Sequence, residues 1–136
     1  MAAMITAEDV VNAATDAMGG PFGWEGASDC SVTACDAFLN LTGIDFGAGL
    51  RGTYSTRAEA LALIRARGGF LAMWRAQAVR CGLVTGAEQS GSIGVLASDG
   101  VNFRTLGLCI RPGLWAAKSQ SGLSFCPANV EQFWNA

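Results

Sequence analysis

The residue best placed to do chemistry is Cys30, which stands at the start of a predicted helix. The stretch Ser28-Asp29-Cys30-Ser31 follows a segment rich in glycine and precedes an apolar helical pattern. A thiol on the first turn of a helix lies at the positive end of the helix dipole, which favours the nucleophilic thiolate. The same position also suits an ordinary buried thiol, because free cysteine is among the most buried residue types.

The sequence contains no histidine, so no imidazole can serve as a base for Cys30. A cysteine hydrolase needs a group that generates the thiolate and then protonates the leaving amine. Five cysteines without a CxxC pair, and without histidine, argue against both a zinc site and a disulfide framework. We therefore expect no metal and no cofactor. We expect the other four cysteines to be reduced thiols of the core, at Cys35, Cys81, Cys109 and Cys126.

The composition indicates a single domain over residues 1–136 that buries apolar surface against other protein. Hydrophobic residues make up 51% and charged residues 15% of the chain, where roughly 25% charged is usual. The net charge is −2 and the nine basic residues form no stripe, so we expect no nucleic-acid partner. No apolar run approaches the ~18 residues of a membrane span, so we expect no membrane insertion. Glu8 and Asp9 stand where a secretory signal needs positive charge, so we expect no signal peptide and synthesis in a bacterial cytoplasm.

The pattern of elements predicts an α+β domain. Capping residues and apolar periodicity predict helices over residues 7–18, 30–42, 57–67 and 70–80, within a helical part at about 4–82. Short apolar runs separated by Gly, Asp, Asn or Pro predict strands over residues 92–97, 105–111, 114–119 and 123–127, within a sheet part at about 91–136. Helices followed by strands, without βαβ alternation, predict N-terminal helices packed on one face of a C-terminal antiparallel meander.

Several motifs carry a resemblance to a known family. Trp24-Glu25-Gly26 followed by Asp29-Cys30-Ser31 resembles the nucleophile motif of the NlpC-type, papain-like cell-wall endopeptidases. "LRGTYSTRAEALALIRARGG" (residues 50–69) is similar to a segment of the phage branch of that family, which is encoded with the distal tail of siphophages and gene transfer agents. "SGSIGVL", "TLGLCI" and "GLSF" resemble, in order, three strands of these proteins. The resemblance implies a papain-like (NlpC-type) fold.

The resemblance also implies roles for individual positions. Cys30 falls on the nucleophile, and the general-base histidine falls on Thr105 in "TLGLCI". The polar residue that orients the histidine falls near Ala117 or Lys118. Threonine cannot accept a proton near pH 7, so this chain departs from the family at the base. We expect the standard mechanism to be lost.

Two functions remain open from the sequence, and we favour the first. The first is a structural subunit of the tail tip or baseplate of a tailed phage or gene transfer agent, located in the virion and bound to other tail-tip or hub proteins. The second is an active cysteine endopeptidase or amidase that opens peptidoglycan crosslinks with Cys30 during envelope penetration, using a base from a neighbouring subunit or an unorthodox residue. A free-standing cytoplasmic acyltransferase of the same superfamily ranks last.

Overall fold

The computed structural model describes residues 4–21, 23, 29–97, 104–119, 122–127 and 129–136. The described residues form four helices followed by five strands. The helices are α1 (Ala7–Met18), α2 (Cys30–Thr42), α3 (Arg57–Ala66) and α4 (Phe70–Cys81). The strands are β1 (Ile93–Leu96), β2 (Thr105–Arg111), β3 (Leu114–Ser119), β4 (Gly122–Cys126) and β5 (Val130–Trp134). The predicted α+β class is therefore confirmed.

The strands form one antiparallel sheet in the order β4-β3-β2-β1-β5. The meander predicted from the sequence holds for β1 to β4, each of which pairs with the next. The fifth strand was not predicted: β5 crosses back to pair with β1. Its sequence, VEQFW, has Glu131 and Gln132 at its centre and is only partly buried, so it lacks the apolar alternation that identifies a strand.

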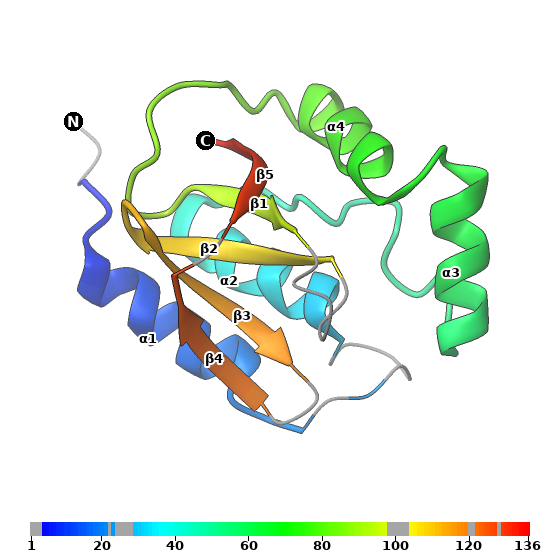
Figure 1. Ribbon diagram of the computed structural model, residues 1–136, viewed down its shortest axis with the longest axis horizontal. Coiled ribbons are helices and arrows are strands. Elements are labelled where there is room, and N and C mark those ends of the chain that lie inside the picture. The colour runs from blue at the N-terminus through cyan, green and yellow to red at the C-terminus, as the bar shows by residue number, and fades with distance from the viewer. Residues whose placement is uncertain (1–3, 22, 24–28, 98–103, 120–121, 128) are drawn as a thin grey trace.

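Two helices cover one face of the sheet and position the cysteine. Figure 1 shows α1 and α2 behind the strands, whereas α3 and α4 lie to one side. Helix α1 packs against α2, and both contact β2 and β3. Side chains of β2 alternate: Leu106 and Leu108 join the large core shared with these helices, whereas Cys109 joins a smaller cluster with Trp115. None of the described helices is long and apolar enough to cross a membrane.

The ring of Phe46 joins the helices to the far edge of the sheet. It is fully buried, and its centroid lies 4.9 Å from that of Trp74 on α4 and 5.7 Å from that of Trp134 on β5. The centroid of the Phe38 ring on α2 lies 6.2 Å from that of Phe46. Because Phe46 belongs to the loop between α2 and α3, this aromatic cluster anchors that loop to the core.

Three of the four tryptophans belong to the interior. The side chains of Trp74, Trp115 and Trp134 are 2%, 0% and 3% exposed, so they are core residues. The fourth, Trp24, lies outside the described residues.

We predict that Phe46→Ala lowers the free energy of unfolding by about 3–5 kcal/mol, because it leaves a cavity among three aromatic rings. Phe125→Ala is the matched control, since Phe125 is 49% exposed on β4, and it should cost less than about 1 kcal/mol. Urea denaturation followed by circular dichroism measures both. Equal losses in the two variants would contradict the role given to Phe46.

Candidate functional site

The candidate site begins at Asp29, which starts α2 and places Cys30 on its first turn. The Asp29 carboxylate accepts hydrogen bonds from the backbone amides of Ser31 at 2.8 Å and Val32 at 3.0 Å. These are two of the donors that a helix start leaves without partners, so the carboxylate acts as the N-cap. Asp29 is therefore the residue that begins α2.

The structure brings Thr105, the first residue of β2, to the sulfur of Cys30. The Thr105 hydroxyl lies near enough to the sulfur to lower the pKa of the thiol. A hydroxyl lowers the pKa of a neighbouring thiol by donating toward the thiolate; the Thr105 hydroxyl also lies 3.2 Å from the carbonyl oxygen of Leu106. Cys30 and Thr105, the two positions that the resemblance pairs, lie 75 residues apart in the sequence and are neighbours in the fold.

The environment of Cys30 keeps its sulfur protonated at neutral pH. Burial raises the pKa of the half-buried Cys30 thiol above the ordinary value of 9.0, and the nearby Asp29 carboxylate raises it further. Hydrogen bonds from Thr105 and Ser31 lower the pKa but do not reverse the shift. The Ser31 hydroxyl lies 3.9 Å from the sulfur. The helix dipole favours the thiolate, but burial and the negative charge of the Asp29 carboxylate at the same end of the helix outweigh that effect.

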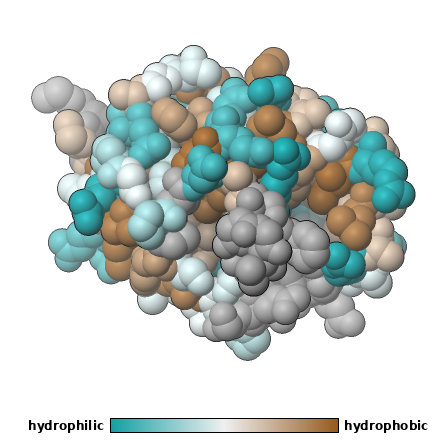
Figure 2. Space-filling view, viewed as in Figure 1, coloured by the Kyte–Doolittle hydropathy of each residue, from teal (hydrophilic) through white to brown (hydrophobic). Residues whose placement is uncertain are grey.

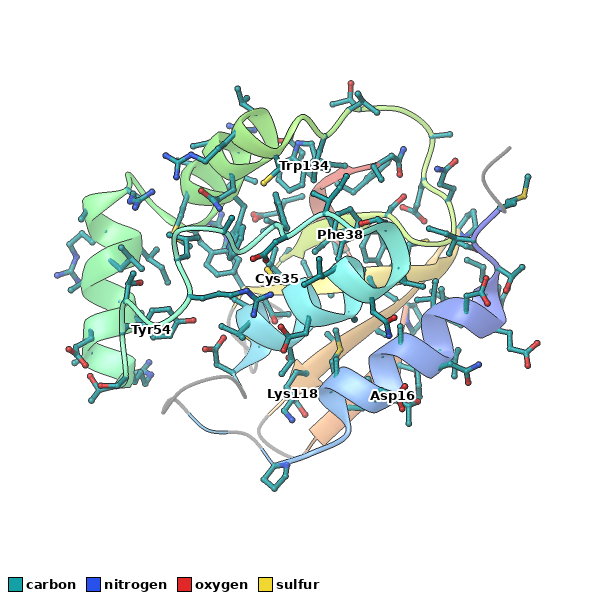
Figure 3. The ribbon with its side chains drawn as sticks, turned by 180° about the vertical axis from the view of Figure 1, so that it is seen from behind. Asp16, Cys35, Phe38, Tyr54, Lys118 and Trp134 are labelled. Carbon is teal, nitrogen blue, oxygen red and sulfur yellow. The ribbon has the colours of Figure 1, made fainter. Side chains whose placement is uncertain are left out.

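Tyr54 also belongs to the site, and its contact with Asp29 was not predicted from the sequence. Its hydroxyl donates to the second carboxylate oxygen of Asp29 at 2.7 Å. Burial raises the pKa of the Tyr54 hydroxyl, and its hydrogen bond to the carboxylate raises it further, so this group holds its proton. Figure 3 shows Tyr54 reaching from the loop before α3 toward the start of α2. The segment "RGTYST" was part of the resemblance found in the sequence, but no local sequence pattern predicts which residue Tyr54 contacts.

The loop that carries Tyr54 is held by an ion-pair cluster. Arg51 contacts the carboxylate of Asp36 on α2 at 2.5 Å and that of Asp45 at 3.0 Å. Asp36 therefore faces Arg51; it lies six residues after Cys30, on another side of the helix. Gln77 on α4 adds hydrogen bonds to the carbonyls of Phe46 at 3.0 Å and Ala48 at 2.9 Å.

The predicted orienting position near Ala117 or Lys118 supplies no polar group to the site. Ala117 pairs with Gly107 on β2 and offers only a methyl group. Lys118 is 3% exposed, and its ammonium donates to the carbonyl of Met18 at 3.0 Å and to that of Gly20. Figure 3 shows it beside the end of α1. Burial lowers the pKa of Lys118, but its hydrogen bonds direct it to the end of α1.

The remaining cysteines lie in the structural parts of the protein. Cys35 and Cys109 are buried and Cys81 is half-buried, all as free thiols. The side chain of Cys126 lies outside the described part of the chain. Within that described part, no three His, Cys, Asp or Glu side chains gather as a metal ion would require.

Comparisons with known proteins give one match. A family model described as "Domain of unknown function (DUF6950)" matches residues 5–136. No curated protein and no solved structure matches the chain.

We predict that Asp29→Asn lowers the pKa of Cys30, because it removes a negative charge beside the thiolate while asparagine still caps the helix. The rate of iodoacetamide alkylation at Cys30, measured by peptide mass spectrometry at pH 8, should rise several-fold. Asp36→Asn removes a carboxylate from the same helix that is paired with Arg51, and it should leave the rate unchanged. An Asp29→Asn protein that reacts no faster than the wild type would refute this electrostatic account.

Proposed function

The chain belongs to the DUF6950 family, and we propose that it is a papain-like domain of the NlpC type with a structural role. It would be a subunit of the tail tip or baseplate of a tailed bacteriophage or gene transfer agent. In this proposal the domain retains the position of the nucleophile but has no base. One observation carries the proposal: the Cys30 sulfur meets the Thr105 hydroxyl where such an enzyme would need an imidazole.

The arrangement of elements supports the papain-like assignment. A cysteine on the first turn of a helix packs against the first residue of a strand in an antiparallel sheet. The residues brought together are those that the resemblance paired. The segment at residues 50–69, which resembles the phage branch, also reaches the site, because its Tyr54 binds the carboxylate that caps α2.

The proton chemistry of the site supports the loss of hydrolysis. The threonine hydroxyl does not ionise near neutral pH and so cannot act as a base, and the Asp29 carboxylate is committed to two backbone amides and Tyr54. That carboxylate also opposes formation of the thiolate. Because general acid–base catalysis supplies about 10²–10⁴-fold, and thiol activation is also weakened, turnover should fall to the background level.

A structural role is consistent with how the site is built. The groups around Cys30 are used for holding the helix, the loop and the sheet together rather than for proton transfer. The resemblance of residues 50–69 to distal-tail proteins supports the tail tip as the place where this domain would bind hub or baseplate subunits. The alternative, an active peptidoglycan endopeptidase or amidase, needs a base from outside this chain.

We predict that the purified protein and the purified particles that contain it cleave crosslinked peptidoglycan no faster than the Cys30→Ala variant does. Muropeptide release, followed by chromatography and mass spectrometry, measures the rate. Peptide mapping of the particles should also detect the chain as a constituent. Cleavage by the wild type that disappears in Cys30→Ala would favour the enzymatic alternative, and particles without the chain would overturn the structural proposal.

We predict that Thr105→His raises the rate of Cys30 alkylation at pH 7 by about tenfold or more, since an imidazole beside the sulfur stabilises the thiolate. Thr105→Val is the matched control: it removes the hydroxyl that lowers the pKa of Cys30, so its rate should fall below that of the wild type. If all three proteins react at the same rate, residue 105 does not face the sulfur.

A further inference from the structure

The charges of this protein are segregated along the chain and therefore in space. All nine basic residues lie at position 51 or later, whereas seven of the eleven acidic residues lie before it. Helices α1 and α2 accordingly carry acidic side chains and no basic ones, and most of the arginines belong to α3, α4 and their connection. Figure 1 shows α1 and α3 toward opposite ends of the long axis of the molecule.

A groove lies at the acidic end, between the outer side of α1 and the C-terminal part of α2. Its volume is about 360 Å³. Ile5, Ala13 and Leu41 supply apolar lining, and Asp9 and Asp16 line it with carboxylates about two turns apart on α1. The Asp9 carboxylate also accepts a hydrogen bond from the Thr6 amide at 2.9 Å. Figure 3 labels Asp16 on α1, and α3 lies at the opposite edge of the same view. Asp16 has no ion-pair or hydrogen-bond partner among the described residues.

At the other end, α3 presents an outer face that the protein itself does not cover. Ala60 is the one buried residue among the ten of this helix. Leu61 is 41% exposed, and Arg57 and Arg65 lie one turn on either side of it. Arg65 is exposed and has no carboxylate partner among the described residues. Figure 2 shows hydrophobic side chains exposed among hydrophilic ones on the side of the molecule where α3 lies.

We propose that α3 of one copy docks into the α1–α2 groove of a second copy. The spacing of groups on the two surfaces matches. Arg57 and Arg65 are eight residues apart, or about 12 Å along a helix, and Asp9 and Asp16 are seven residues apart, or about 10.5 Å. Leu61 lies between the two arginines and would meet the apolar lining of the groove.

The charge pattern identifies a second copy of this chain as the occupant. The groove needs a cationic partner with an apolar side chain at its centre, and α3 has that composition. Because α1 and α3 lie toward opposite ends of one molecule, the contact joins different copies. Such a head-to-tail contact leaves one free groove and one free α3 at the ends, so it generates rings or open chains rather than an isolated pair. The inference uses surfaces other than the Cys30 site and does not depend on the proposed function.

The association should depend on salt. The carboxylates and guanidinium groups are exposed, and their attraction is screened over about 10 Å at 0.1 M salt and about 3 Å at 1 M. The burial of Leu61 adds a salt-independent part. We therefore expect species larger than the monomer at low salt that dissociate when salt is raised.

Sedimentation velocity of the full chain, measured over a wide range of concentration at low and high salt, tests the proposal. The wild type should form species larger than a dimer at low salt. Arg65→Glu and Asp16→Arg should each weaken the association by about tenfold or more, because like charges then face each other. A mixture of the two variants should associate again, since each altered surface then meets the opposite charge. Arg75→Glu makes the same charge change on α4, where the Arg75 side chain hydrogen-bonds Gln132 of β5, and should associate as the wild type does.

Circular dichroism of each variant checks that the fold is intact. A wild type that remains monomeric throughout would overturn the proposal, as would a monomer that binds duplex DNA through Arg65. Association that survives both single variants, or that a mixture of them fails to restore, would equally exclude this contact. A closed dimer that Arg65→Glu and Asp16→Arg both disrupt would contradict the head-to-tail arrangement.

Discussion

The contact between the sulfur of Cys30 and the hydroxyl of Thr105 is the constraint on which this account of the protein depends. It joins the first turn of α2 to the first residue of β2 across a separation of 75 residues, at the junction of the helical part and the sheet. Cys30 is fixed there because Asp29 starts the helix, and Thr105 is fixed because β2 lies inside the sheet between β1 and β3. The position of the sulfur is therefore determined by the fold, whatever its chemical use.

The groups next to the Cys30 sulfur then determine which chemistry it can perform. A buried carboxylate caps α2, binds Tyr54 and lies close enough to Cys30 to disfavour its thiolate. The same carboxylate stabilises the helix start and restrains the loop between α2 and α3. In this arrangement Asp29 contributes to stability at the expense of thiol reactivity. A hydroxyl at residue 105 moderates the pKa of the sulfur but cannot carry the proton that hydrolysis requires.

The sequence predicted the parts of the structure that depend on local patterns. The capping residues Asp29 and Thr56 begin α2 and α3 where expected, and Gly43 ends α2 in the left-handed conformation that favours glycine. The pairing of Cys30 with Thr105 came from the order of motifs in the chain rather than from local chemistry. β5 was missed because its central residues, Glu131 and Gln132, are polar, so its short sequence lacks the apolar alternation of a strand. The contact of Tyr54 with Asp29 depends on the path of a loop, which no periodicity encodes. The segregation of charge, in contrast, is visible in the sequence and becomes informative only when the fold places α1 and α3 toward opposite ends.

The most direct test of the central claim is the pH dependence of alkylation at Cys30 in the wild type, followed by peptide-resolved mass spectrometry. We expect the rate to keep rising with pH beyond the ordinary thiol pKa of 9.0, because burial and Asp29 both favour the protonated sulfur. A rate that has already reached its plateau below neutral pH would show a preformed thiolate. That result would contradict the proposal that this site does not support hydrolysis.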